Sequence, residues 1–171
     1  MRWRAMTTAD LAAVDAIAAK VHPFYPEDAS VPAERLELYP DGCRVLDAAR
    51  RDGIGGAISG YVVSHPWHLG QPPPLNALIG RLPERASTYY IHDLALLPEA
   101  RGSGAADAIV RQLLRHAAES GLGTVSLVAV NDSVRFWQSY GFDIVDLPEL
   151  RPKLSSYDSR ARLMVREVGA A

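Results

Sequence analysis

Several features that define common protein classes are scarce in this chain of 171 residues. It has a single cysteine, Cys43, which excludes an intramolecular disulfide and a cysteine-rich metal site. Its net charge is only -2 and its pI about 6.2, so the composition favours neither a nucleic-acid groove nor an anionic membrane surface. No apolar run is long enough to span a bilayer, and the first residues lack the apolar stretch of a signal peptide. We therefore expect a soluble, cytoplasmic protein that binds neither nucleic acid nor membrane.

The chain does have strand and helix patterns over a length that suits one domain, residues 1–171. Apolar runs predict strands at 2–6, 43–49, 57–65, 89–97, 124–130, 142–147 and 161–168. Helical spacing predicts helices at 7–21, 33–42, 104–120 and 131–140. Thr7 with Asp10 is expected to cap the first helix, and Asn131 or Asp132 the last. Segments 22–32 and 66–88 are proline-rich and should be irregular, and residues 52–56 form a glycine-rich turn. This order predicts an α+β domain with a mixed sheet and helices on both faces.

The most informative stretch is RGSGAA, residues 101–106, which follows a predicted strand and opens a predicted helix. The first turn of a helix has free N–H groups and a partial positive charge, and glycines let a ligand approach the backbone, so this is a candidate phosphate site. A P-loop is excluded because Ala105 and Ala106 follow Gly104 where it needs lysine and then serine or threonine. Only two glycines fit the spacing of the dinucleotide fingerprint. Two interpretations remain. One is the pattern Arg-x-x-Gly-x-Gly/Ala, matched by Arg101, Gly104 and Ala106, and the other is an ordinary helix start.

Two motifs together resemble the GNAT superfamily of acyl-CoA-dependent N-acetyltransferases. One is LALLPEARGSGAADAIVRQLLRHA, which runs from strand through turn into helix. The other is NDSVRFWQSYGF, an asparagine, a short aromatic helix and Gly-Phe. Both lie between Tyr89 and Phe142, in the order that the family has, separated by one predicted strand. The resemblance implies a GNAT-like fold with a mixed, mostly antiparallel sheet, and acetyl-CoA as co-substrate without a metal.

The resemblance also implies where coenzyme A lies. The turn would hold the pyrophosphate through backbone N–H groups, and the edge of the preceding strand would bind the pantetheine arm like an added strand. That strand would splay from the next one and leave a cleft, with Asn131 on the opposite side of the arm. The implied cofactor-binding residues are Leu94, Ala95, Leu96, Leu97, Arg101, Gly102, Ser103, Gly104, Ala105, Ala106, Asn131, Phe136 and Trp137.

The implied reaction is direct attack of an amine on the thioester of acetyl-CoA in a ternary complex. An alkylamine titrates near ~10 and arrives protonated, so a base must take a proton, and an N–H near Leu96 would stabilise the oxyanion. His92 is the predicted base because histidine titrates near ~6.5 and regular alternation places it on the strand face of Leu94 and Leu96. Arylalkylamine N-acetyltransferases of this superfamily have a histidine at the matching position. The same alternation places Asp93 on the other face, and a core histidine bonded to the backbone is the alternative for His92.

The proton donor to the leaving thiolate is less defined. Many family members have tyrosine four residues before the Gly-Phe pair, where this chain has Trp137, whose indole has no titratable proton. Tyr140, beside Gly141, and Tyr157, in a predicted loop that in this family often borders the acceptor site, are the candidate acids. Unassisted departure is the other alternative, because thiols titrate near ~8.5.

In this family the segment after the first helix and the loop before the cofactor strand usually shape the acceptor pocket. Here these are residues 22–28 and 66–88, where Glu27 or Asp28 is expected to attract an ammonium group. Candidate substrate-binding residues are His22, Phe24, Tyr25, Trp67, His68 and Tyr90, with proline-fixed packing as the alternative for each. The five histidines have no convincing metal spacing, which predicts no metal site.

The expected protein is an enzyme that acetylates the primary amine of a small molecule. A protein acetyltransferase acting on a lysine or an N-terminus is one alternative. A non-catalytic acyl-CoA sensor is another, favoured by Trp137 in place of the tyrosine. A protein acceptor needs an open groove and a small amine a closed pocket, so the conformation of residues 66–88 discriminates between them. Members of the family often form dimers, which leaves a homodimer open.

Overall fold

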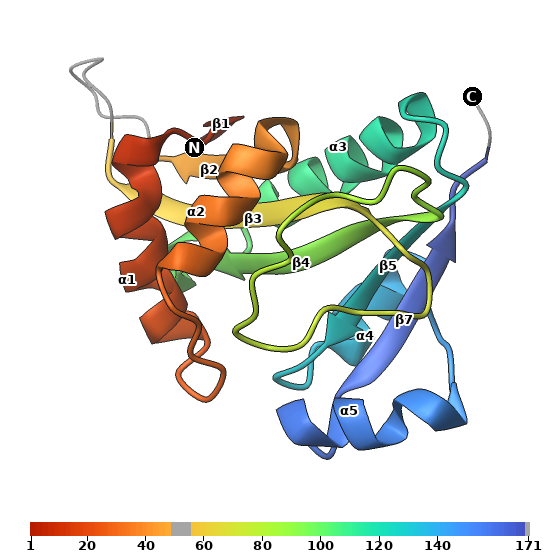
Figure 1. The fold of residues 1–171 in the computed structure, drawn as a ribbon. Helices are drawn as coiled ribbons and strands as arrows, with labels where there is room; N and C mark the ends of the chain where they lie inside the picture. The colour runs from red at the N-terminus through yellow and green to blue at the C-terminus, as the bar shows by residue number, and fades with distance from the viewer. Residues whose placement is uncertain (49–55, 170–171) are drawn as a thin grey trace.

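The central feature of the computed structural model, which describes residues 1–48 and 56–169, is a seven-stranded sheet (Figure 1). Its strands are β1 (Arg2–Ala5), β2 (Cys43–Asp47), β3 (Ile58–Trp67), β4 (Thr88–Leu96), β5 (Thr124–Ala129), β6 (Asp143–Ile144) and β7 (Arg162–Glu167). They lie in the order β1-β2-β3-β4-β5-β7-β6, and β4 runs parallel to β5 while the other neighbours pair antiparallel. The predicted mixed, mostly antiparallel sheet is confirmed. The predicted turn at 52–56 lies outside the described residues except for Gly56.

Helices cover both faces of this sheet (Figure 1). On one face lie α1 (Leu11–Val21) and α2 (Ser30–Leu38), and on the other α3 (Ala105–Glu119) and α4 (Val134–Ser139). Short 3-10 turns occur at Thr8–Asp10, Pro40–Gly42, Pro98–Ala100 and Pro148–Leu150. Successive residues of β3 point to opposite faces of the sheet. Val62 packs in the core under α3 and α4, and Val63 packs in the core under α1. This alternation is what a strand produces when both of its faces are buried.

The helix that follows the glycine-rich turn forms as its pattern predicts. Its buried face consists of Ile109, Val110, Leu113 and Ala117, which lie at helical spacing. Gly104 is the residue before the helix and has φ 82°, a left-handed conformation that favours glycine. Gly121, with φ 73°, ends the helix, and the N–H of Leu122 donates to the carbonyl of Ala117 at 3.0 Å. Both ends are therefore set by local sequence.

Three predicted boundaries were wrong in ways that matter for the site. Helix α2 begins at Ser30, inside a segment predicted to be irregular, because the Asp28 carboxylate accepts a hydrogen bond from the N–H of Ser30 at 2.9 Å. The predicted strand 142–147 is only the two-residue β6. The predicted loop after it instead contains α5 (Arg151–Tyr157), which begins with a proline in its first turn and ends at Tyr157.

The predicted cap of the aromatic helix also differs. Ser133 precedes α4, and no side chain caps the helix. Asn131 and Asp132 have φ 53° and 57°, so they form a left-handed turn before it. The side chain of Asn131 is thereby free to reach another part of the chain. By contrast, the capping pair predicted for the first helix is present: the Asp10 carboxylate accepts from the N–H and the hydroxyl of Thr7.

Residues 68–87, here called the strap, connect β3 to β4 without a helix or strand and lie over the same sheet face as α1 and α2 (Figure 1). Two neighbouring residues of α2 hold it. The buried guanidinium of Arg35 donates from Nη2 to the carbonyl of Ala77 at 2.9 Å. The carboxylate of Glu34 accepts from the N–H groups of Ile79 and Gly80 at 2.9 and 2.7 Å. The strap is therefore fastened to the helical layer.

Further hydrogen bonds join the strap to the segment after α1 and to helix α5. The Glu27 carboxylate accepts from the N–H of Asn76 at 3.0 Å, and Nζ of Lys153 donates to the carbonyl of Pro72 at 2.6 Å. The hydroxyl of Tyr157 donates to the carbonyl of Pro73. The strap thus bridges the segment after α1, helix α2 and helix α5, which are far apart in sequence.

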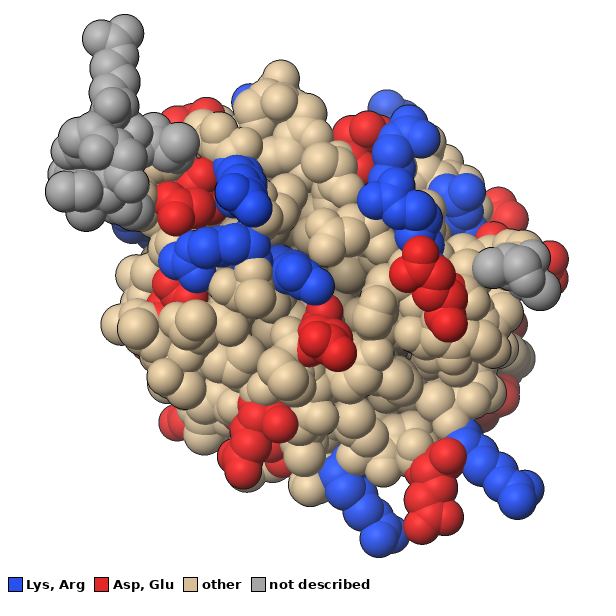
Figure 2. All heavy atoms as spheres, turned by 90° about the horizontal axis from the view of Figure 1, so that it is seen from above, with Lys and Arg blue, Asp and Glu red and all other residues tan. Residues whose placement is uncertain are grey.

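The surface carries charges of both signs close together. Figure 2, seen from above, shows Lys and Arg side chains beside Asp and Glu side chains across that face. Among the described residues, no helix has the length and apolarity needed to cross a membrane.

Candidate active site

The site begins where β4 and β5 separate. They pair at Tyr89 with Val125, Tyr90 with Ser126 and Ile91 with Leu127. Beyond Ile91, β4 pairs only with β3, although it continues to Leu96. The backbone groups of β4 that face β5 in this part therefore have no strand partner, and the strands separate as the family resemblance implied.

The glycine-rich turn lies at the end of this edge and can accept a phosphate group. Gly102 and Gly104 have φ 73° and 82°, and a Cβ built on either would meet nothing within 4 Å. Within the described part of the chain, the N–H groups of Gly102, Ser103 and Gly104 have no protein acceptor. Free N–H groups at the start of the 15-residue helix α3 attract an anion. The turn can therefore hold a phosphate group through its backbone.

A cavity of about 670 Å³ extends from this turn along the separated strands and is called the β4–β5 cavity below. Nine of the predicted cofactor residues line it: Leu94, Leu96, Arg101, Gly102, Gly104, Ala106, Asn131, Phe136 and Trp137. Four do not: Ala95, Leu97, Ser103 and Ala105. Ala95 lies on the opposite face of β4 and packs with Leu97 in the core under α1, and Ala105 is buried at the start of α3. Strand alternation explains why every second residue of β4 points away.

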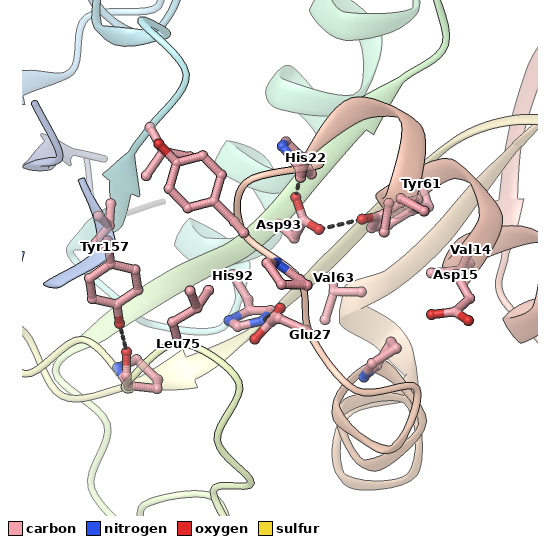
Figure 3. A pocket seen from close by; sticks show the side chains of 18 of the residues that line it. Val14, Asp15, His22, Glu27, Tyr61, Val63, Leu75, His92, Asp93 and Tyr157 are labelled. Atoms are coloured by element: carbon pink, nitrogen blue, oxygen red, sulfur yellow. Dashed lines mark hydrogen bonds and ion pairs between the residues drawn. The ribbon is translucent and has the colours of Figure 1, made fainter.

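A second cavity, of about 310 Å³, lies between the sheet, the α1 end and the strap, and is called the strap cavity (Figure 3). Its walls include Pro73, Pro74 and Leu75 of the strap. His22, His92, Asp93, Val128 and Val130 line both cavities. The two cavities therefore meet at one place, beside His92, and can present two molecules to each other.

His92 reaches this place through an irregularity in β4. Val63 of β3 pairs with Asp93, but the next residue, Ser64, pairs with Ile91. His92 is thus the extra residue of a β-bulge, which interrupts the alternation of side chains. As a result His92 and Asp93, although consecutive, both line the strap cavity and the β4–β5 cavity. The prediction that His92 shares a face with Leu94 and Leu96 was therefore wrong, because it assumed regular pairing. Leu94 packs in the core under α3, whereas His92 lies with Asp93 on the α1 face.

A carboxylate orients the imidazole of His92. Oε1 of Glu27 lies 2.8 Å from Nε2 of His92, and the other carboxylate oxygen of Glu27 binds the strap at Asn76. When Nε2 carries the proton and donates a hydrogen bond to the Glu27 carboxylate, Nδ1 is the free basic nitrogen. Glu27 therefore links the position of the strap to the orientation of His92.

A second histidine–carboxylate pair lies beside the first (Figure 3). Asp93 forms an ion pair with His22, 2.9 Å between oxygen and Nε2, and accepts a hydrogen bond from the hydroxyl of Tyr61. Burial lowers the pKa of His22, but the Asp93 carboxylate outweighs it and the net pKa is raised. Burial likewise raises the pKa of Asp93, yet contacts with His22 and Tyr61 bring it below the usual value. Nδ1 of His22 lies 2.9 Å from the amide nitrogen of Asn131, which lines the β4–β5 cavity.

The two predicted acids lie in different cavities. Tyr140 lines the β4–β5 cavity, together with Trp137 and Phe136, whose rings pack edge to face. Tyr157 lines the strap cavity, and its hydroxyl donates to the Pro73 carbonyl, while burial raises its pKa to about 12. Tyr157 is thus neutral and engaged in holding the strap. Its role as an acid, like that of Tyr140, stays a prediction.

The predicted acceptor residues divide by position. His22, Tyr25 and Tyr90 line the strap cavity. Phe24 has 82% of its surface exposed and does not line either cavity, and Trp67 instead donates from its indole N–H to the Gln71 carbonyl at 2.8 Å. Phe24 faces solvent because the proline-rich segment turns it outward, whereas Trp67 packs edge to face on His65.

Several lining residues had no signal in the sequence. Tyr61, Val128 and Val130 read as ordinary strand residues, and Pro73 and Leu75 as part of a long loop. The pairing of β4 with β3 and with β5, together with the folding of the strap, brings them to the cavity. Among the described residues there is no cluster of three or more His, Cys, Asp or Glu side chains that could hold a metal ion.

The mixed sheet, the glycine-rich turn and the two adjoining cavities define an acyltransferase that uses an acyl-CoA. The chain belongs to the GNAT acetyltransferase family, whose profile matches residues 11–142. No curated protein matches the sequence.

Solved structures share the fold at low sequence identity. The GphF GNAT-like decarboxylase in complex with isobutyryl-CoA is 18% identical, with a TM-score of 0.78 and coverage of 99% of this chain and 100% of that chain. The loading GNATL domain of CurA from Lyngbya majuscula is 18% identical, with a TM-score of 0.78 and coverage of 98% and 97%. Naa20 of Chaetomium thermophilum in complex with a bisubstrate analogue is 20% identical, with a TM-score of 0.70 and coverage of 98% and 87%.

Proposed function

We propose that this protein is an N-acetyltransferase that moves the acetyl group of acetyl-CoA to the primary amine of a small molecule. The single observation that carries the proposal is the meeting of two cavities at His92. One cavity ends at the glycine-rich turn, and the other is enclosed by the strap. Such an arrangement suits direct transfer, because two bound molecules can react only where their cavities join.

In this proposal the β4–β5 cavity takes acetyl-CoA, which supplies the acetyl thioester. The free N–H groups at Gly102, Ser103 and Gly104 hold the pyrophosphate, and the unpaired edge of β4 holds the pantetheine arm. The N–H groups of that edge are also the donors available to the carbonyl oxygen as it becomes negative. Asn131 contacts the arm from the other wall.

The amine occupies the strap cavity and loses a proton to His92. Glu27 holds Nε2, so Nδ1 accepts the proton and the resulting imidazolium is stabilised by the Glu27 carboxylate. Tyr140 is the proposed proton donor to the leaving sulfur, because it lines the same cavity as the proposed thioester, whereas the Tyr157 hydroxyl is bound to the strap.

The closed strap supports a small acceptor over a protein. A peptide in an open groove needs a free path across the sheet, but here Pro73, Pro74 and Leu75 form a wall of the cavity. The strap residues that follow this wall are fixed by a hydrogen bond that Arg35 donates and by others that the carboxylates of Glu34 and Glu27 accept. The volume of about 310 Å³ lies at the small end of the ~300–1,000 Å³ that ligand pockets occupy.

The test measures free thiol released from acetyl-CoA with a panel of primary amines and with peptides. Small amines should release thiol, and His92→Ala should lower kcat at least about 100-fold without changing the affinity for coenzyme A. The matched control is His68→Ala, an exposed histidine of the strap outside both cavities, which should leave kcat unchanged. Transfer to peptides but not to small amines, or full activity of His92→Ala, would overturn the proposal.

A further inference from the structure

We infer that the acceptor is a primary amine with an apolar body and no acidic group on the carbon that bears the nitrogen. This inference rests on the proposed function and narrows it to one class of amine. It depends on the charges and the wall chemistry of the strap cavity.

The strap cavity has acidic side chains and no counterpart to bind an anion. Among the described residues, the lining contains Asp15, Glu27 and Asp93 but no lysine and no arginine. The nearest buried cation outside the lining, Arg35, is turned to the Glu34 carboxylate and the Ala77 carbonyl. An ammonium group therefore finds opposite charge here, whereas a carboxylate finds like charge and, as its one cationic neighbour in the lining, a His22 that is already paired with Asp93.

The two histidines do not cancel this negative charge. His22 is a single charge whose ion pair, at 2.9 Å, is with Asp93, and Glu27 acts on it only through its charge, without a hydrogen bond. His92 must be neutral to accept a proton, so in the reactive state the Glu27 carboxylate keeps its full charge 2.8 Å from Nε2. An amine nitrogen at the junction of the cavities has Asp93 and Glu27 as neighbours, and a carboxylate one carbon away would be brought against both.

Apart from the Tyr90 hydroxyl, the rest of the wall is apolar or already hydrogen-bonded. Aliphatic and proline side chains dominate: Val14, Ala18, Pro26, Pro32, Val63, Pro73, Pro74, Leu75, Val128 and Val130. The hydroxyls of Tyr25, Tyr61 and Tyr157 donate to Asp158, Asp93 and the Pro73 carbonyl respectively. Few polar groups are left to receive a polar substituent, so the body of the acceptor is apolar.

The experiment compares three amines of nearly equal shape: phenylethylamine, phenylalaninamide and phenylalanine. The first has hydrogen on the carbon beside the nitrogen, the second a neutral amide, and the third a carboxylate. We expect kcat/KM to fall no more than about 10-fold from the amine to the amide, and at least about 100-fold further to the carboxylate. Binding of each compound to the protein saturated with coenzyme A is measured in parallel by calorimetry.

The outcomes separate this inference from the proposed function. If the protein binds phenylethylamine, phenylalaninamide and phenylalanine in decreasing order of affinity but releases no thiol, the acetyl transfer is refuted and the charge preference stands. Equal use or equal binding of phenylalanine and phenylethylamine would refute the charge preference and keep the acetyl transfer. Equal loss with the amide and the carboxylate would assign the effect to size, which also overturns the inference.

A charge placed on the strap gives a second measurement. Leu75→Arg puts a cation in the wall of the cavity, and it should reduce the preference for the amine over phenylalanine at least about 10-fold. Leu78→Arg adds the same charge to the same strap at an exposed residue outside the cavity, and the preference should stay as in the original protein. If both variants reduce the preference equally, the change is due to long-range charge, and the inference that the charges lining the cavity select the amine is contradicted.

Discussion

Replacing Gly104 by alanine separates the role of the glycine-rich turn in folding from its role in binding. Gly104 has φ 82°, and a Cβ there would meet no protein atom within 4 Å. The added methyl group therefore causes no clash inside the protein, and the cost to folding is the left-handed backbone alone, about 1 kcal/mol. For a domain of this size that cost lowers Tm by about 2–4 °C.

The cost to binding should be larger. The methyl group points into the β4–β5 cavity, beside N–H groups that have no acceptor within the described residues. A displaced anion loses at least one charge-assisted hydrogen bond, about 1.5–3 kcal/mol, which corresponds to about a 10- to 100-fold weaker Kd for coenzyme A.

The control is Gly121→Ala at the other end of the same helix. Gly121 has φ 73°, and a Cβ there also meets nothing within 4 Å, so the folding cost should match. Calorimetric titration with coenzyme A should show unchanged affinity for Gly121→Ala and the loss for Gly104→Ala. If both variants bind coenzyme A equally well after the same fall in Tm, the turn does not hold the pyrophosphate and our reasoning about it fails.

Two other substitutions test the groups around the strap cavity. Tyr157→Phe removes the hydrogen bond to Pro73, which contributes about 1 kcal/mol. Steady-state assays should therefore show KM for the amine raised about 2- to 10-fold and kcat nearly unchanged. A fall in kcat of about 100-fold would instead indicate that Tyr157 is an acid. The pKa of His22 is raised in the folded state, so its contribution to stability is complete below its unfolded pKa of about 6.5 and is lost as pH rises through the folded pKa. Urea unfolding should therefore show His22→Gln less stable than the original protein by a larger margin at about pH 6 than at about pH 9, and a margin independent of pH would contradict the ion pair with Asp93.

Local features of the sequence predicted the parts of the fold that depend on local physics. The glycines on both sides of α3 have positive φ, and the buried residues between them follow helical spacing, so this element could be read directly. Helix α5 could not, because its seven residues have no buried apolar face and begin beside prolines that also suit a turn. Helix α2 starts without a side-chain cap, and the Asp28 carboxylate that accepts from the N–H of Ser30 lies among prolines that predict an irregular segment.

The site was predictable only where one strand sufficed. His92 was singled out from its position before the cofactor segment, but it was assigned to the face of Leu94 and Leu96, because a bulge depends on the register with β3 and could not be foreseen. The pairs Glu27 with His92 and Asp93 with His22 join residues that are 65 and 71 positions apart. Nothing in the sequence near either residue specifies such partners, since tertiary folding alone brings them together.

The attachment of the strap to Arg35 limits how this region can be shortened. The Arg35 side chain is fully buried, and the Ala77 carbonyl is one of its few acceptors. A deletion that trims residues 68–87 would leave this guanidinium inside the protein without that acceptor, at a cost comparable to the loss of a buried charge partner. Removing the strap therefore requires that Arg35 be replaced by an apolar residue. A different loop placed between β3 and β4 has to be transferred together with the helix α2 that it packs against.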